Sequence, residues 1–499
     1  MVLDSGRARD PVVNIVGPDS SEPYPAAARR SWAEKPFYHR SSALHQVVFL
    51  EEGAAALQAR LEMIARARRS IDLEYYLFDT NHQSTRMLIQ ALVSKAREGI
   101  RVRILRDYTP FGSRFDPWLV AVLREAGVEV KIFNPAWDIN PWQFRAHRKL
   151  LIVDGKEVIT GGRNIDDSYF GLHRRKNFVD LDIWVKGEIV AVIRDSFEEF
   201  WNSKYSRPAL FPRFPARADY VNSTPSQYYQ DRRWYYRRME AARARHLDPA
   251  PLEELLGRVE RVAARQLNRN KGYESSDISF ASDRPEGPRF HRVLSQVIFD
   301  RILESRPSIR IMAPYFLPLR TGEKIIGQLL DQGVPVEVLG NSRFSYDDLI
   351  SIGHVIESFA RPLVRKGMVF HGYSGRPPPG EELVRDDYHP RVNWEFHSKA
   401  AIFGRDSVMI GTYNFDPRSK FFNAETAIFI DGNPAAALEM RRLFEKLAGN
   451  SFRLGASGDY DCDNFRALSG WLRARRFGLF DAIKNLAVQA IALLASDML

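Results

Sequence analysis

The chain of 499 residues is poor in cysteine and has no long apolar run. Cys462 is its single cysteine, which excludes an intramolecular disulfide framework and is compatible with a reducing compartment. No stretch reaches the roughly 18 apolar residues expected of a membrane-spanning helix, so any membrane contact should be peripheral. The first 25 residues carry acidic side chains and no continuous apolar region, which disfavours a secretory signal.

What the chain has in excess is positive charge, with a formal net charge of +10. Such a surface concentrates phosphate-bearing ligands, and both phospholipid headgroups and nucleic acids qualify. Hydrophobic residues make up 44% of the chain, enough to bury a substantial core and to argue against global disorder. At about 150 residues per unit, the length suggests roughly three units.

The most informative feature is a repeated segment, AHRKLLIVDGKEVITGGRN in the first half and FHSKAAIFGRDSVMIGTYN in the second. In both copies a lysine follows the histidine by two residues, a glycine by fourteen and an asparagine by seventeen. The paired positions are His147 and His397, Lys149 and Lys399, Gly161 and Gly411, and Asn164 and Asn414. One such pattern would mean little, but two copies in one register predict a single active site built from two halves.

The repeat extends beyond this segment to whole domains. Helical patterns at 56–69 and 87–99 alternate with strand-like patterns at 70–78 and 100–108, and the same order returns at 293–307, 308–318, 323–333 and 334–342. This alternation predicts two similar α/β domains. We expect domain 1 at 36–211 and domain 2 at 281–450, after a flexible lead-in at 1–35.

Two further segments flank the second domain. Residues 212–280 form a basic and aromatic helical connector, which could touch phosphate surfaces or could be a solvated linker whose arginines pair with nearby glutamates; the balance favours the linker. Residues 451–499 form an extension in which arginines precede an apolar tail helix. That helix could lie in an anionic membrane interface or dock on the protein, and the sequence does not separate the two.

The paired residue types fit attack on a phosphodiester. Such a reaction needs a nucleophile, a proton donor for the leaving alcohol and positive charge around the phosphate oxygens. One histidine can attack phosphorus while the other protonates the leaving group and later deprotonates the incoming alcohol. Lys149 and Lys399 would hold the phosphate oxygens, and Asn164 and Asn414 would donate neutral hydrogen bonds. The small residues allow close backbone approach; they are Gly161, Gly162, Gly411 and Thr412.

This pattern resembles the paired HKD motif of the phospholipase D superfamily. The phrases GGRNIDDSYFG, GTYNFDPRS, DLEYYLFDTN and MAPYFLP most resemble its bacterial cardiolipin synthase branch. The resemblance implies two phospholipase D-like α/β/α domains related by a pseudo-twofold axis, with one active site between them. It also implies that His147 is the nucleophile and His397 the acid and base, an assignment that spacing alone does not make.

The resemblance further implies supporting carboxylates. Glu425 and Asp180 each open a strand-like run after their motif and would orient the histidines, with Asp182 a competing choice in the first half. The motif aspartate is Asp154 in the first half, but Gly404 stands at its place in the second, with Asp406 two residues later. Because this aspartate ties the turn together in the family and does not contact phosphate, we expect the second half to stay active.

The expected function is transfer of a phosphatidyl group to phosphatidylglycerol, giving cardiolipin. Hydrolysis by water, cleavage of a nucleic-acid phosphodiester and a non-enzymatic scaffold on anionic surfaces stay open as alternatives. The donor would be phosphatidylglycerol or phosphatidylethanolamine. No cysteine cluster or HExxH motif is present and the lysines fill the phosphate-binding role, so no metal or other cofactor is expected. We expect a monomer in the cytoplasm, peripheral at the inner face of the cell membrane.

Overall fold

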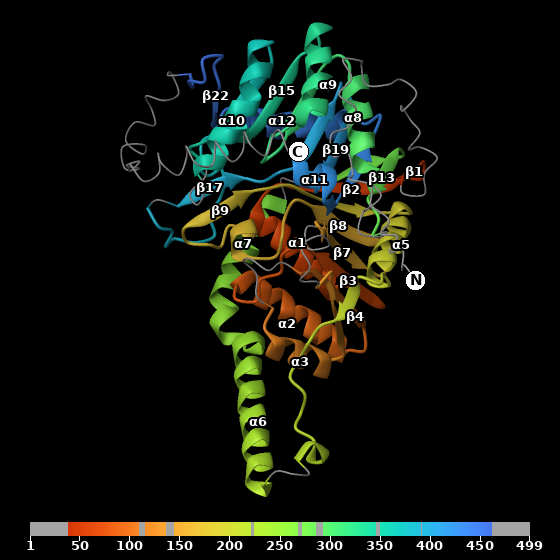
Figure 1. Cartoon of the computed structure of the whole chain (residues 1–499), viewed down its shortest axis with the longest axis vertical. Coiled ribbons are helices and arrows are strands. Elements are labelled where there is room, and N and C mark those ends of the chain that lie inside the picture. Colours follow the sequence, from red (N-terminus) through yellow and green to blue (C-terminus); the bar gives the residue numbers. More distant parts are fainter. Residues whose placement is uncertain are drawn as a thin grey trace, which may run out of the picture.

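The computed structural model describes residues 38–108, 115–135, 144–220, 224–267, 272–285, 293–345, 350–390 and 392–461. The expected lead-in at 1–35, Cys462 and the apolar tail helix lie outside these ranges. In the view of Figure 1 the two halves of the chain are stacked, with the first half in the lower lobe and the second in the upper lobe.

Two nine-stranded sheets with equivalent strand orders form the two lobes of the described chain. The first sheet runs β11 (Ser206–Pro208), β5 (Val128–Phe133), β4 (Arg101–Asp107), β3 (Ser70–Tyr75), β7 (Lys149–Val153), β8 (Glu157–Gly161), β10 (Asp182–Lys186), β2 (His45–Leu50) and β12 (Gly272–Ser275). The second runs β22 (Ser451–Arg453), β16 (Val369–Tyr373), β15 (Val336–Asn341), β14 (Ile309–Met312), β18 (Ala400–Phe403), β19 (Ser407–Gly411), β21 (Thr426–Ile430), β13 (Ile278–Ser282) and β1 (Tyr38–Ser41). The predicted pair of similar α/β domains is confirmed.

Helices cover both sheets, which explains why motif strands such as β7 (KLLIV) are buried along their whole length. One core of the first lobe joins its sheet to α1 (Gly53–Ala65), α2 (Gln83–Arg97), α3 (Pro117–Glu125) and α7 (Glu253–Leu267). The matching core of the second lobe includes α8 (Leu294–Glu304), α9 (Leu319–Asp331) and α10 (Ile350–Arg365). A third core is shared: it joins residues of both sheets with α5 (Ile189–Trp201) and α12 (Pro434–Ala448).

The lobes exchange their edge strands. β1 precedes every element of the first sheet in sequence, yet it pairs with β13 in the second sheet. In return, β12 from the connector pairs with β2 in the first sheet. The sheets therefore do not follow the predicted bounds, since β1 lies within 36–211 but belongs to the second sheet, and β12 lies in the connector but belongs to the first. The division of the chain into units at 35/36 and 280/281 stays a prediction.

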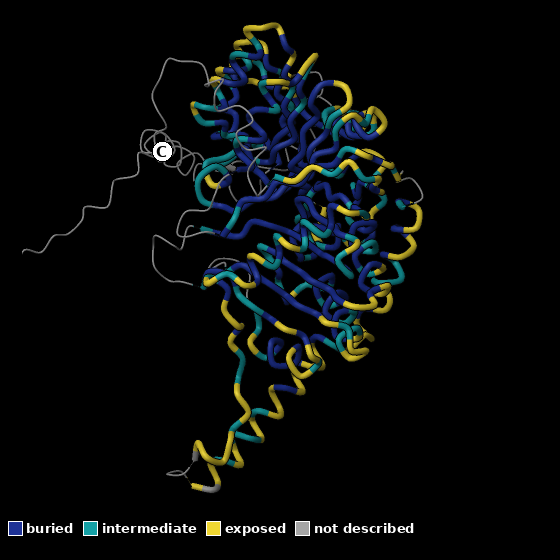
Figure 2. The backbone as a smooth tube through the Cα atoms, turned by 90° about the vertical axis from the view of Figure 1, so that its right-hand side faces the viewer, coloured by how far each residue is buried: buried dark blue, intermediate teal, exposed yellow. Residues whose placement is uncertain are grey.

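The connector is helical at its centre, with α6 (Pro225–Leu247) followed by the 3-10 turn η4 (Ala250–Leu252) and α7. α7 packs on α1 within the first lobe. By contrast, most of α6 projects from the body, as Figures 1 and 2 show. None of the helices in the described ranges combines the length and the apolarity needed to cross a membrane.

Candidate active site

Two short parallel strand pairs between the lobes position the two motif histidines. β6 (Arg145–Ala146) pairs with β20 (Asn423–Ala424), and β9 (Lys176–Val179) pairs with β17 (Asn393–Phe396). The ladders continue one residue further, because the amide of His147 donates to the carbonyl of Ala424 at 3.0 Å and that of His397 to Val179 at 2.8 Å. Each histidine thus lies beside the residue that follows the partner strand in the other half.

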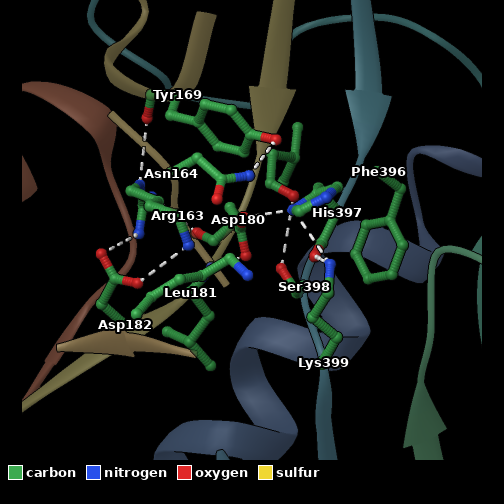
Figure 3. A network of polar contacts seen from close by, with 12 residues as sticks. Arg163, Asn164, Tyr169, Asp180, Leu181, Asp182, Phe396, His397, Ser398 and Lys399 are labelled. Atoms are coloured by element: carbon green, nitrogen blue, oxygen red, sulfur yellow. Dashed lines mark hydrogen bonds and ion pairs between the residues drawn. The ribbon is translucent and has the colours of Figure 1, made fainter. Parts of the chain in front are cut away.

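Those neighbouring residues are the two supporting carboxylates, so each histidine is paired across the halves. His147 Nδ1 lies 2.8 Å from Glu425 Oε2. His397 Nδ1 lies 2.6 Å from Asp180 Oδ2, the pair that Figure 3 shows. The sequence pointed to both acids, but not to their crosswise pairing. Asp182, the competing choice, is instead held by ion pairs with Arg60 at 2.8 Å and Arg163 at 3.3 Å.

Glu425 is enclosed by hydrogen-bond donors. The hydroxyl of Thr412 donates to its Oε2, while Ser419 Oγ at 2.7 Å and Asn423 Nδ2 at 3.2 Å donate to Oε1. Burial raises the pKa of Glu425 to about 7, against the opposing effect of Lys149 and these donors. Burial likewise raises the pKa of Asp180, whose Oδ1 accepts from the amide of Leu181 at 2.8 Å.

Both imidazoles are held in the neutral form. Burial, followed by the ammonium groups of Lys149 and Lys399, lowers the pKa of His147 well below its usual value, and the same two lysines act on His397. Because a carboxylate is an acceptor, each Nδ1 is assigned as the donor. The lone pair of each imidazole is then on Nε2, the atom available for attack on phosphorus or for proton transfer.

The two lysines fold back onto their own motifs. Lys149 Nζ donates to the carbonyl of His147 at 2.7 Å, and Lys399 Nζ donates to that of His397 at 2.5 Å and lies 2.9 Å from His397 Nδ1. Burial lowers the pKa of Lys149 to about 7 and that of Lys399 to about 8. Since each lysine affects both histidines, the two half-sites share one electrostatic environment.

The two motif asparagines differ in their surroundings. Asn164 Nδ2 donates to the hydroxyl of Tyr169 at 2.7 Å, and Asn164 Oδ1 accepts from the amide of Leu77 at 3.2 Å. Asn414 is fixed through its backbone, whose amide donates to Ser419 Oγ at 3.0 Å. Its side-chain Oδ1 is buried and has no hydrogen-bond partner within the described residues. Asn414 is therefore the less engaged of the two amides.

The motif glycines leave room for the crossing carboxylates. A Cβ on Gly162 would overlap the carboxylate of Asp180, and one on Gly161 (φ +149°) would lie 2.5 Å from Asp182 Oδ1. In the second half, a Cβ on Gly411 would press on the backbone carbonyl of Thr426. At these positions glycine is required for close approach of the neighbouring strand.

We predict that Gly162→Ala lowers activity by about 100-fold or more, because the added methyl group displaces Asp180 and with it His397. Overpacking should also lower the free energy of unfolding by about 1–3 kcal/mol. Gly257→Ala is the matched control, since a Cβ there meets only the side-chain tip of Arg261 at 3.5 Å. Turnover and thermal unfolding of both variants test this, and a fully active Gly162→Ala would contradict the placement of Asp180.

The turn after β7 explains the missing second aspartate. Asp154 has φ +55°, and its carboxylate accepts from the amides of Arg68 at 3.0 Å, Arg69 at 2.7 Å and Ser70 at 3.0 Å. Gly404 has the same left-handed conformation, φ +65°, but a Cβ there would overlap the carbonyl of Arg306. Backbone from the neighbouring segment fills the space of the aspartate, and the turn is kept by the bond from the amide of Gly404 to Ser308 at 2.9 Å.

The sequence alone did not assign aromatic rings to the two histidines. The ring of Tyr76 packs edge-on against His147 with 4.9 Å between centroids, and Tyr169 and Phe178 each lie 5.1 Å from His397. Tyr76 and Tyr169 belong to phrases that carried the family resemblance, DLEYYLFDTN and GGRNIDDSYFG, as does Ser419 in GTYNFDPRS. These phrases are the sequence signal from which the three residues could have been found.

Within the described residues, no group of three or more His, Cys, Asp or Glu could hold a metal ion.

Comparison with known proteins identifies the family of this chain. The family model described as cardiolipin synthase, PLD-like domain, matches residues 61–201 and 298–448, once in each half. An uncharacterized protein of Helicobacter pylori (strain ATCC 700392 / 26695) is 27% identical over 465 residues, covering 88% of this chain and 86% of that protein. Cardiolipin synthase C of Escherichia coli (strain K12) is 27% identical over 418 residues, covering 79% and 83%.

The fold is shared with a solved structure, that of phosphatidylserine synthase from Haemophilus influenzae Rd KW20. The two agree with a TM-score of 0.56 at 15% sequence identity, over 88% of this chain and 94% of that one. At this identity the likeness concerns the fold alone. The family model, in contrast, matches both halves and more than half of the residues. The chain therefore belongs to the phospholipase D superfamily, in the family of the cardiolipin synthase PLD-like domain.

Proposed function

We propose that the protein is a phosphatidyltransferase that makes cardiolipin through a phosphohistidine intermediate. The observation that carries this proposal is the crosswise pairing of His147 with Glu425 and His397 with Asp180, with Lys149 and Lys399 acting on both imidazoles. A nucleophile, a proton carrier and two cations in one buried site are the groups that a two-step displacement at phosphorus needs. The membership of the family supports the lipid substrate.

In the first step, Nε2 of His147 attacks the phosphorus of the donor phospholipid. A phosphorus–nitrogen bond forms as the bond to the headgroup oxygen breaks, and His397 in its imidazolium form passes its Nε2 proton to the leaving alcohol. Glu425 stabilises the positive charge that develops on His147. The bound phosphodiester anion favours the imidazolium of His397, offsetting the lysines that keep it neutral in the empty site.

In the second step, the hydroxyl of phosphatidylglycerol gives its proton to Nε2 of His397 and attacks the phosphohistidine. The phosphorus–nitrogen bond breaks, cardiolipin leaves and His147 is regenerated. Transfer to an alcohol instead of water requires exclusion of water from the intermediate. The low exposure of His147 (6%) and His397 (7%) and the rings of Tyr76, Tyr169 and Phe178 support that exclusion.

The lysines predict a pH dependence of substrate binding. In the free protein Lys149 loses its charge as the pH rises through about 7 and Lys399 through about 8. Glu425 gains its negative charge near pH 7, and this also weakens the binding of an anion. We therefore expect the affinity for a water-soluble phosphodiester, whose own charge is constant here, to fall several-fold above pH 7. Binding above this pH should take up protons, because the anion favours the charged lysines.

Calorimetric titration in buffers of different ionisation enthalpy measures both the affinity and the proton uptake. Lys149→Met should reduce the change in affinity near pH 7, to which Glu425 also contributes, while the change near pH 8 remains. An affinity that is constant or that rises between pH 6 and 9, within the range set by these pKa values, would contradict the assignment of the lysines as the phosphate-binding cations.

The proposed function is tested by mass-spectrometric analysis of products from phosphatidylglycerol vesicles, with and without phosphatidylethanolamine, in the presence of a chelator. Cardiolipin from the wild type and none from His147→Ala is the expected result. Release of glycerol or of ethanolamine identifies the donor. Phosphatidic acid as the main product would replace transfer by hydrolysis, and absence of any lipid product would reject the lipid substrate.

A further inference from the structure

A helical arm projects from the first lobe, away from the shared core. The arm consists of residues 209–220 and helix α6 (Pro225–Leu247), and it ends well beyond α3 in Figure 1. In Figure 2 much of it is coloured as exposed. At about 1.5 Å per residue, the 23 residues of α6 span roughly 35 Å. Neither half-site uses any residue of this arm.

The inner stripe of α6 accounts for its attachment to the body. Met239 and Ala242 are buried against Ala121 and Val122 of α3. About one turn nearer the tip of the arm, the ring of Tyr235 packs edge-on against Trp118 with 5.4 Å between centroids. These contacts bury the apolar side of α6 against the first lobe, as expected of an amphipathic helix attached to its domain.

A second stripe, facing solvent, is not needed for that attachment. Tyr229, Arg233, Tyr236 and Arg237 are spaced i, i+4, i+7 and i+8, so they share one side of the helix, and all four are exposed. Tyr229 is 61% and Tyr236 49% exposed. Leu210, at the base of the arm, is 87% exposed. Exposed aromatic and aliphatic side chains of this size, alternating with cations, favour a partner with both apolar and anionic parts.

The arm carries more positive than negative side chains. Residues 209–247 include eight arginines and three acidic residues. Arg243 pairs with Glu125 at 2.6 Å, as a solvated linker would require. Within the described residues, however, Arg232, Arg233, Arg237 and Arg238 form no ion pair.

Aromatic rings, not carboxylates, accompany two of these arginines. The guanidinium of Arg232 lies 5.1 Å from the ring centre of Phe214, and that of Arg238 lies 5.5 Å from that of Trp234. The interpretation of the connector as a linker with glutamate-paired arginines therefore does not describe its projecting part.

We propose that this arm docks the protein on an anionic lipid bilayer. Tyrosine and tryptophan side chains partition to the interface between headgroups and acyl chains, and arginines bind lipid phosphates while their stems stay near the apolar layer. A protruding arm with exposed tyrosine side chains can enter a planar bilayer surface, whereas single-stranded nucleic acid is usually bound along a basic groove. The inference concerns where the protein meets a membrane, and it goes beyond the chemistry proposed for the histidines.

Sedimentation with vesicles of phosphatidylcholine, with or without phosphatidylglycerol, tests this proposal on the full chain. We expect salt-sensitive binding to the anionic vesicles only. Arg233→Gln combined with Arg237→Gln should weaken it roughly ten- to thirty-fold, at about 1 kcal/mol per arginine. Tyr229→Ala combined with Tyr236→Ala should weaken it several-fold. Arg365→Gln with Lys366→Gln, at the exposed end of α10 in the other lobe, is the matched control and should bind as the wild type does.

Two readouts separate this proposal from the proposed function. His147→Ala should bind vesicles like the wild type, and the arm variants should keep wild-type turnover of a short-chain phospholipid dissolved below its micelle concentration. The proposal is overturned if the wild type does not bind anionic vesicles or if the arm variants bind as tightly as the control. Arm-dependent binding of single-stranded DNA without vesicle binding would overturn it as well.

Discussion

Cardiolipin formation should be lost in His147→Ala, with a decrease of at least about 10⁴-fold, because removal of the proposed covalent nucleophile would remove the two-step route altogether. Because the side chain packs on Tyr76 and bonds to Glu425 at the junction of the halves, thermal unfolding of the variant accompanies the activity measurement. His389→Ala, at an exposed histidine outside the site, is the matched control and should keep wild-type activity.

The same account predicts what the other histidine does. With His397 replaced by asparagine, a donor that carries a good leaving group should still react, but the incoming alcohol lacks its base and the phosphatidyl group should accumulate on His147. Mass spectrometry of the quenched protein locates the adduct. An adduct on His397 of the wild type, or unchanged turnover in His147→Ala, would reverse or reject the assignment of the nucleophile.

The second large effect is expected at the carboxylates. Glu425→Gln and Asp180→Asn should each lower transfer by about 10²- to 10⁴-fold, since a neutral amide neither fixes the tautomer nor stabilises the imidazolium. Asp406→Asn is the control, at an exposed acid in the second motif that lies outside both pairs. Thermal unfolding should show that all three variants remain folded.

The crosswise pairing makes these two variants distinguishable. A donor with a nitrophenol leaving group needs no proton from His397, so Asp180→Asn and His397→Ala should recover nitrophenol release in the first step. Glu425→Gln should not recover, because Glu425 bonds to His147, the proposed nucleophile. If carboxylates instead served the histidine of their own half, Asp180→Asn would stay slow and Glu425→Gln would recover. The pattern of rescue therefore tests the pairing itself, beyond the importance of the residues.

Sequence periodicity was sufficient for the architecture because both domains alternate helix and strand in the same order around a shared motif. The register of the two motifs likewise brought His147, His397 and the two lysines into one candidate site. Periodicity cannot show edge exchange: β1 and β12 are four-residue strands whose partners lie in the other lobe. Choosing that partner depends on long-range packing that a local pattern does not contain.

The crosswise carboxylates escaped prediction for the same reason. Glu425 and Asp180 follow β20 and β9, and only the parallel ladders of these strands with β6 and β17 determine which histidine each acid meets. Gly404 is a different case, since the carbonyl of Arg306 fills the space that the aspartate occupies in the first motif. The rings of Tyr76 and Tyr169 were visible in the sequence but could not be assigned to a histidine without the fold.

The proposed mechanism uses one site, shared by the two halves, to transfer a phosphatidyl group by two successive displacements through histidine. The most direct test is the stereochemical course at phosphorus, measured with a donor that is chiral through sulfur and oxygen-isotope substitution. Two in-line displacements predict retention of configuration in the product. Inversion would mean a single direct displacement and would contradict the phosphohistidine, whatever lipid the protein acts on.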